Sequence, residues 1–264
     1  VIWNLGKQRT TQLEAFARSN NVTVNTILQS IWAILLQRYN NVRDVVFGFI
    51  VSGRTTKITQ IDEMVGLFIN TIPLRVNTNV EKRYKEIIKK IKADFDENEP
   101  YRYVSIAEIQ KNTEVKSGLI NTLMVFENYP IDKNLINEGI LEKAGIEIGE
   151  PQSYEETNYS FNLKVISGEE ITIVFDYNDG AYDKEAVLNI KNHFAGILDQ
   201  IMENPEIMIN ELELSGYEER NTLLEDFNST YVQLDNKATI QGLFEYQAIK
   251  NPEKTAIVYD DKTM

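Results

Sequence analysis

The chain has 264 residues, of which 42% are hydrophobic and 25% are charged, as in an ordinary globular protein with a real core. The net charge of −13 argues against a general nucleic-acid or anionic-membrane surface, and no apolar run approaches the roughly 18 residues of a membrane span. The lack of cysteine excludes disulfides, thiolate metal sites and a cysteine nucleophile, and no metal site is expected.

The first residues, VIWNLGKQRT, lack both an initiator methionine and the basic-then-apolar order of a signal peptide. The last residues stop abruptly at Met264. We therefore expect a cytoplasmic protein and a chain cut from a longer polypeptide.

Two helices are predicted near the start of the chain. Residues 10–20 show a short amphipathic pattern, and residues 24–39 form a stronger one that is apolar on most sides. Thr23 precedes the second pattern and is a good N-cap candidate. The second helix is therefore expected to be buried.

Two strands follow, separated by a loop. Residues 45–51 are apolar at almost every position, which is typical of a strand covered on both faces, and residues 71–76 form the second strand. The triplet Ser52-Gly53-Arg54 ends the first strand, and residues 66–70 lead into the second. Polar side chains at strand ends often line sites, although a plain solvated turn is the alternative. Four such residues stand here: Ser52, Arg54, Asn70 and Thr71.

The next predicted elements are a helix over 79–98 that Pro100 ends, a short helix over 105–111 and a buried strand over 121–128. The long helix places isoleucines inward and a lysine cluster outward, most simply as its solvated face. Tyr129-Pro130 closes the strand, and residues 137–151 give no clear prediction.

A hairpin and a long helix come next. Residues 159–166 and 171–177 alternate as half-buried strands around the turn at Ser167-Gly168. Asp183 is positioned to cap a helix that ends near Glu203. Residues 206–238 are then predicted to form a linker that packs partly on the neighbouring domain. A helix pattern begins at Thr239 and precedes a short strand over 255–259.

The amino-acid sequence of these segments resembles that of the second half of a condensation domain from a nonribosomal peptide synthetase. The stretch VSGR matches the family at residues 51–54, and VGLFINTIPLR matches it at 65–75. The motif residues are Gly66, Phe68, Ile69, Asn70, Thr71 and Arg75. Residues 22–39 and the strand that ends in Glu127-Asn128-Tyr129-Pro130 follow the family in the same order.

The resemblance implies an α/β fold, a two-layer sandwich of the chloramphenicol-acetyltransferase type. It makes residues 1–204 the C-terminal lobe of a condensation domain and 205–238 an inter-domain linker. Residues 239–264 resemble the start of an adenylation domain, too short to fold as one. The implied setting is a multidomain enzyme that makes an antibiotic or another secondary metabolite.

The implied reaction joins two substrates that carrier domains hold as phosphopantetheine thioesters. The amine of the acceptor aminoacyl group attacks the donor thioester and forms an amide, which requires proton removal and oxyanion stabilisation. The family's signature for this chemistry is His-His-x-x-x-Asp-Gly. The chain has one histidine, His193, which fits a structural or surface role, and Asp179-Gly180 has no histidine before it. We expect the signature to lie in a missing N-terminal lobe and this chain alone to be inactive.

The implied partners are that N-terminal lobe, donor and acceptor carrier domains and a downstream adenylation domain, with no nucleic acid, no membrane and no directly bound cofactor. The resemblance assigns the substrate tunnel to Ser52, Gly53, Arg54, Asn70 and Thr71, and a structural motif to Gly66, Phe68 and Arg75. Asn70 and Thr71 are expected to contact the pantetheine arm or the new amide, and Arg54 to hold the local loop. Alternatively, Asn70 only satisfies neighbouring backbone groups.

Three alternatives remain open. An acyltransferase of the same superfamily would use free coenzyme A, but the adenylation-like end favours a modular synthetase. An epimerization domain usually departs from the GLFINT pattern and is not normally followed directly by an adenylation domain. A module that only docks carrier domains would have no chemistry of its own.

Overall fold

The computed structural model describes residues 1–54, 58–78, 82–115, 118–127, 157–231, 233, 239–260 and 262–263. The chain forms two compact units, Val1–Gly216 and Tyr217–Met264. The expected strand end at Tyr129-Pro130 and the unassigned stretch 137–151 lie outside the described residues.

The first unit is built on a six-stranded mixed sheet with the order β1-β6-β5-β4-β2-β3. The middle strands β2, β4 and β5 run parallel to one another, whereas β3 and β6 are antiparallel to their neighbours β2 and β5. The strands are β1 (Ile2–Asn4), β2 (Asp44–Val51), β3 (Asn70–Asn77), β4 (Thr122–Glu127), β5 (Phe161–Ile166) and β6 (Thr172–Tyr177).

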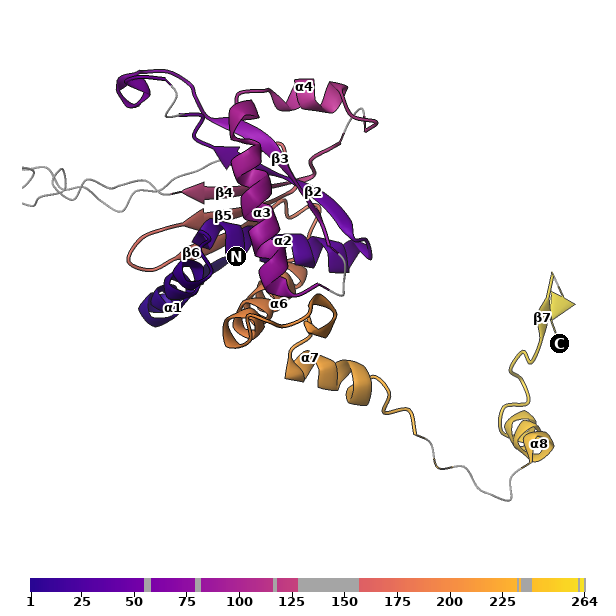
Figure 1. Ribbon diagram of the computed structural model, residues 1–264. Helices are drawn as coiled ribbons and strands as arrows, with labels where there is room; N and C mark the ends of the chain where they lie inside the picture. The colour runs from indigo at the N-terminus through magenta and orange to yellow at the C-terminus, as the bar shows by residue number, and fades with distance from the viewer. Residues whose placement is uncertain are drawn as a thin grey trace, which may run out of the picture. The chain divides into compact units, whose positions relative to one another are not determined.

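Four long helices form a layer over one face of this sheet (Figure 1). They are α1 (Gly6–Ser19), α2 (Val24–Asn40), α3 (Tyr84–Glu97) and α6 (Lys184–Glu203), and the short α4 (Ile106–Lys111) follows α3. Side chains such as Phe47, Ile31 and Phe194 fill the space between the layers. The predicted two-layer α/β architecture is therefore confirmed.

The ends of several helices follow from single residues. Thr23 caps α2, since its side-chain oxygen accepts a hydrogen bond from the backbone N–H of Thr26 at 3.1 Å. Ser105 caps α4 in the same way. Asp183 stands at the N-cap position of α6, but its side chain makes no capping hydrogen bond, which corrects the expected role of its carboxylate.

Some predicted bounds are wrong. The first helix begins at Gly6, before residue 10, and α3 begins at Tyr84 because Arg83 pairs with Met208 as a β-bridge. Strand β1 was not predicted, since its three residues give no pattern and its partner β6 lies far along the chain. Strand β2 is fully buried on its helix-facing side only, since Val46 and Ile50 on the other side are half-buried.

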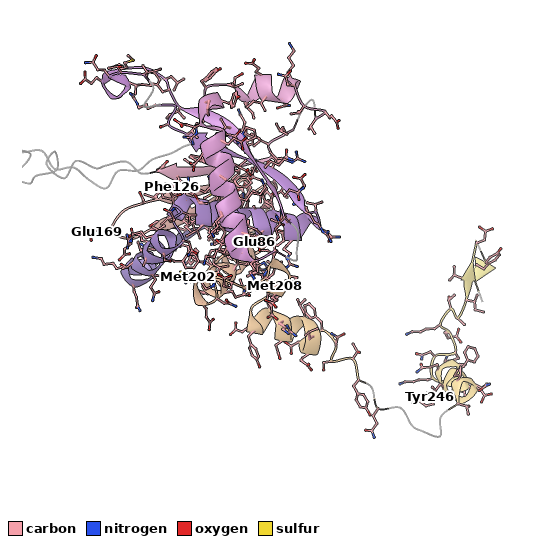
Figure 2. All side chains as sticks on the ribbon, viewed as in Figure 1. Glu86, Phe126, Glu169, Met202, Met208 and Tyr246 are labelled. Carbon is pink, nitrogen blue, oxygen red and sulfur yellow. The ribbon has the colours of Figure 1, made fainter. Side chains whose placement is uncertain are left out.

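The segment that follows α6 is held to the first unit as far as a 3-10 turn at Ile209–Glu211. Ile209 and Leu212 are buried in the core. The backbone N–H of Tyr84 donates to the carbonyl of Ile207 at 2.9 Å. Figure 2 labels Met208 of this segment near Glu86 of α3.

The second unit contains two short helical segments and a small hairpin. Tyr217–Asn221 is α7, which continues into a helical turn at Thr222–Asp226, and α8 spans Ile240–Lys250. Strands β7 (Val258–Tyr259) and β8 (Lys262–Thr263) pair with each other. No residue of α7 or α8 is buried.

Candidate functional site

The candidate residues meet at one edge of the sheet, where the parallel strands end. Ser52, Gly53 and Arg54 directly follow β2, and in the antiparallel register Val51 pairs with Asn70 and Ile50 pairs with Thr71. The carboxyl ends of parallel strands in α/β sheets are common binding positions. The structure therefore brings together all five residues that the resemblance assigned to the tunnel.

Gly53 lets the turn after β2 approach the stretch that precedes β3. Its φ angle is +65°, in the left-handed region that favours glycine. A Cβ atom at this position would lie 1.8 Å from the carbonyl oxygen of Phe68. No side chain fits there, so the close contact between the turn after β2 and the stretch before β3 requires glycine.

Arg54 binds the loop that joins β2 to β3. Its guanidinium donates to the carbonyl oxygens of Ile61 and Met64, the latter at 3.1 Å. The centre of the guanidinium also lies 4.7 Å from the centroid of the Phe68 ring, a cation–π contact. Arg54 therefore links three points of this loop.

The side chain of Asn70 is engaged by neighbouring backbone. Its Nδ2 donates to the carbonyl oxygens of Arg102 and Val104 at 2.7 and 2.9 Å, and its Oδ1 accepts from the N–H of Thr71 at 3.0 Å. Both amide hydrogens are used. Asn70 thus fixes the segment 102–104 beside the start of β3.

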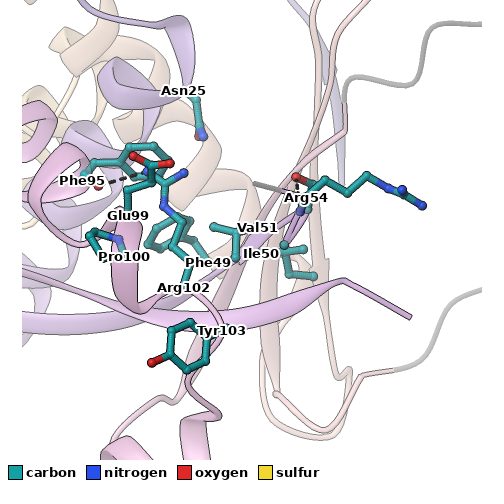
Figure 3. Close-up of a pocket in the computed structure, with 12 residues that line it drawn as sticks. Asn25, Phe49, Ile50, Val51, Arg54, Phe95, Glu99, Pro100, Arg102 and Tyr103 are labelled. Atoms are coloured by element: carbon teal, nitrogen blue, oxygen red, sulfur yellow. Dashed lines mark hydrogen bonds between the residues drawn. The ribbon is translucent and has the colours of Figure 1, made fainter. Parts of the chain in front are cut away.

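Two hollows lie on either side of the end of β2, with Ile50, Ser52 and Arg54 in the lining of both. The first has a volume of about 500 Å³, and the second of about 400 Å³. The first is bounded further by Asn25, Phe49, Phe95, Glu99, Arg102 and Tyr103 (Figure 3). The second is bounded by the loop before β3, including Gly66 and Phe68, and by the end of β4.

The sequence analysis did not identify Arg102, which lines the first hollow. Its guanidinium lies over the ring of Phe95, with 3.8 Å between the two centres, and Nη2 donates to the Phe95 carbonyl at 3.0 Å. Burial lowers the pKa of Arg102, while Glu99 and Asp96 act against this shift. Only the tertiary contact of α3 with β2 places this arginine at the hollow, and no local pattern signals it.

Arg75, the last residue of the matched motif, lies outside both hollows. It forms a bidentate ion pair with Asp44, with its Nη2 2.6 Å from Oδ2, and thereby joins β2 to β3. The hydrogen bonds from Arg75 lower the pKa of Asp44. This contact is structural.

His193 and the Asp179-Gly180 pair also lie outside the lining of the two hollows. His193 is buried on α6, and its Nδ1 lies 2.6 Å from the hydroxyl of Tyr39 on α2. Asp179-Gly180 forms a turn in which the N–H of Gly180 donates to the side chain of Asn178 at 2.8 Å. His193 therefore joins two helices.

Within the described ranges, no helix is both long enough and apolar enough to cross a membrane.

A family model described as "Condensation domain" matches residues 1–241. Among curated relatives, bacitracin synthase 3 of Bacillus licheniformis is 37% identical over 261 residues, which are 99% of this chain and 4% of the relative. Gramicidin S synthase 2 of Brevibacillus brevis is 36% identical over 256 residues, 97% of this chain and 6% of the relative. The chain thus spans a small part of the proteins that it matches.

Solved structures show the same fold at low sequence identity. A holo four-domain nonribosomal peptide synthetase bound to AMP and glycine aligns with 97% of this chain and 20% of its own, with a TM-score of 0.72 and 14% identity. The first condensation domain of the CDA synthetase aligns with 82% of this chain and 48% of its own, with a TM-score of 0.63 and 15% identity.

Proposed function

The chain belongs to the condensation-domain family, and from this premise we propose that it is part of a domain that forms amide bonds between carrier-bound substrates. In this reaction the acceptor amine attacks the donor thioester carbonyl. The carbon–nitrogen bond forms, the carbon–sulfur bond breaks, and the proton lost by the amine ends on the released thiol. Phosphopantetheine enters as the arm of each substrate and not as a group resident in this chain.

The observation that carries the proposal is that Ser52 and Arg54 line both hollows at the carboxyl edge of the sheet, with Asn70 next to them as the partner of Val51 in the register of β2 with β3. Both hollows have apolar walls and backbone groups beside polar side chains, which suits an arm made of methylene and amide groups. Arg54 and Asn70 would act as positioning residues, since their polar atoms hold the loop and the 102–104 segment. Ser52, which lines both hollows, would contact the arm, and Thr71 stands beside it as the strand partner of Ile50.

We propose further that residues 1–204 are the C-terminal lobe, 205–238 the linker and 239–264 the start of an adenylation domain. The division into two compact units supports this, because it falls at Gly216, within the proposed linker. The catalytic histidine would come from the other lobe, and the chain alone would not catalyse. Carrier domains and the adenylation domain would be its partners in a peptide synthetase.

A single-turnover condensation assay with two loaded carrier proteins tests the proposal. The chain alone is compared with the chain mixed with a separately produced N-terminal lobe, and product is expected in the mixture only. Product from the chain alone would show that this chain carries its own catalytic groups. A folded mixture that binds both carriers but gives no product would support a docking module.

Asn70→Ala in the same mixture tests the positioning role. We expect slower condensation with an unchanged fold, because the 102–104 segment loses two hydrogen bonds beside the hollow. Asn112→Ala is the matched control, since the Asn112 amide also donates to a backbone carbonyl, that of Glu108, which unlike Arg102 lines neither hollow. Equal turnover in both variants would refute the role of Asn70.

A further inference from the structure

Strands β2 and β4 are neighbours in the sheet, but they pair with each other at two positions only. Each pairs along its full length with its other neighbour, β2 with β3 and β4 with β5. Between β2 and β4, Gly48 pairs with Leu123 and Phe49 with Met124, and the pairing stops before either strand ends. The two parallel strands therefore separate toward their carboxyl ends and form a fork.

The second hollow occupies this fork. Its lining includes Ile50 and Ser52 from the end of β2 and residues 125–127 from the end of β4. Arg54 and residues 66–69, which lead into β3, complete the lining. The volume of about 400 Å³ lies within the range of ligand sites, roughly 300–1,000 Å³. The fork is therefore large enough to hold part of a substrate.

The backbone of Phe126 points into the fork. Phe126, labelled in Figure 2, is half-buried and lines the second hollow. In a strand the N–H and C=O of one residue point to the same side, and this side alternates along the chain. The carbonyl of Glu127 faces β5, because it accepts from the N–H of Ser167 at 3.0 Å. Both backbone groups of Phe126 therefore face β2, and within the described ranges nothing bonds to them.

The charged side chains at this hollow are already engaged. Glu127 forms an ion pair with Lys164 at 3.5 Å, and Arg54 donates to the loop carbonyls of Ile61 and Met64. A charged ligand would have to displace one of these contacts, so the hollow favours a neutral ligand. An N–H and a C=O that project from one residue of an open strand edge are the groups that another peptide backbone pairs with.

We propose that the fork between β2 and β4 binds the backbone of an extended peptidyl group. Its C=O accepts from the N–H of Phe126, and its N–H donates to the C=O of Phe126. Ile50, Val125 and Leu67 offer apolar surface to its side chains, and Leu67 is 91% exposed. Because the contacts are to backbone, the site selects for an internal peptide bond more than for particular side chains.

The peptidyl donor fits this site better than the other amide-bearing or aminoacyl parts of the substrates. A free aminoacyl group has no internal amide. The pantetheine arm has two amides, but two methylene groups separate them, whereas strand pairing requires an N–H and a C=O that flank a single carbon. Because Ser52 lines both hollows, an arm that reaches it through the first hollow places its peptidyl group in the second. This assignment to the donor rests on the proposed function, whereas peptide binding is a property of the chain.

The test uses the full 264-residue chain with ¹⁵N-phenylalanine and ¹³C-methyl valine, and follows the Phe126 amide and the Val125 methyl groups by NMR. The first probe is N-acetyl-trialanine methylamide. Further probes replace each of its amides in turn by an ester, which removes one N–H and keeps the shape. We expect the peptide to shift both signals saturably and at least one ester to bind about fivefold more weakly, because one hydrogen bond is lost.

Val125→Trp should fill the fork and abolish the saturable shift of the Phe126 amide. Val174→Trp is the matched control, because Val174 is also half-buried and stands in the same row of the sheet, where Lys164 pairs with both valines. Val174 lines neither hollow, so peptide binding should persist in this variant. The ester series needs no substitution and decides the question if the Val125 variant does not fold.

Four outcomes would overturn the proposal. No shift with the peptide would show that the fork binds no backbone, and equal binding of the peptide and all its esters would show a merely apolar hollow. Pantetheine that binds as tightly as the peptide would assign the fork to the arm. Loss of peptide binding when a separately produced N-terminal lobe is added would assign it to the contact between lobes. The condensation assay is a separate readout, so its failure with intact peptide binding would remove the proposed function alone.

Discussion

Gly53 is the residue on which the contact between the turn after β2 and the segment before β3 depends. Gly53→Ala would place a methyl group 1.8 Å from the Phe68 carbonyl oxygen and would require φ of +65° of an alanine. We expect the loop to move away and the free energy of unfolding to fall by about 1–3 kcal/mol, measured by urea denaturation. The movement of the loop should also break the contact between Arg54 and Phe68.

Gly196→Ala is the matched control for that change. Gly196 lies inside α6, and a Cβ atom there would meet nothing within 4 Å. Alanine in a helix interior is more favourable than glycine by roughly 0.5–1 kcal/mol, so this variant should be more stable than the parent. Equal effects of the two substitutions would contradict the steric argument at Gly53.

Tyr84 is fully buried, and its hydroxyl lies 2.7 Å from Ser30 Oγ. Ser30 donates its own hydrogen to the carbonyl of Ile27 at 2.6 Å, so Tyr84 is the donor to Ser30. Burial raises the pKa of Tyr84 above its ordinary value. Below pH of about 10 the phenol is neutral in both the folded and the unfolded chain, and its contribution to stability does not change with pH.

Above that pH the unfolded chain releases a proton that the folded chain keeps. Stability should therefore fall as pH rises, by about 1.4 kcal/mol per pH unit from this group. Tyr84→Phe should remove this part of the decrease, while costing only about 1 kcal/mol at neutral pH because Ser30 keeps its bond to Ile27. Denaturation curves of the two proteins between about pH 8 and 11 measure the difference, and parallel pH profiles would refute it.

The sequence was informative for residues that follow strands and poor for residues that meet through helices. Ser52, Asn70 and Thr71 were predicted at strand ends, and the register of β2 with β3 brings them together. Asn25 and Arg102 were not predicted, because they stand 77 positions apart and share a hollow only through the packing of α2 and α3. Long-range packing of this kind leaves no local pattern.

At the scale of one element, Thr23 offers a clean test of helix capping. Thr23→Ala removes the hydrogen bond that the N–H of Thr26 donates to Thr23 Oγ1, and the contact of the two hydroxyls at 2.9 Å. We expect the free energy of unfolding to fall by about 1 kcal/mol, because α2 is the buried helix of the layer. Thr23→Ser keeps the cap oxygen and should recover most of the loss in thermal denaturation. A serine variant as unstable as the alanine variant would assign the effect to the lost methyl group.

Helices and strands with a long apolar pattern were predicted well, and so was the short α4, whereas β1 and the start of α3 were not. Residues 24–39 differ from the observed α2 by a single residue at the end, and the hairpin of β5 with β6 was predicted from its alternation. Strand β1 has only three residues and forms because β6 provides an edge for it. The start of α3 is decided by the β-bridge of Arg83 with Met208, which is a tertiary contact.

At the scale of the whole molecule, the two units differ in how much apolar surface they bury. Among the described residues, every residue of the core belongs to the first unit, whereas in α8 the side chains of Ile240, Phe244 and Ile249 are 85%, 66% and 81% exposed. A helix of 11 residues with no buried residue is marginal in water. The composition of the chain alone did not reveal this difference.

Removing residues 217–264 should therefore leave the thermal unfolding of the first unit unchanged. The physical reason is that α7 and α8 have no buried residue whose apolar surface would stabilise the fold. Calorimetry of the full chain and of residues 1–216 measures the effect. A decrease of about 2–4 °C in the melting temperature would indicate a lost contribution near 1 kcal/mol and contradict the prediction.

Hydrogen exchange tests α8 itself. The amides of α8 should exchange rapidly in this chain and become protected when the proposed adenylation sequence is joined after Met264. Rapid exchange in the extended protein would argue against α8 as the first helix of that domain.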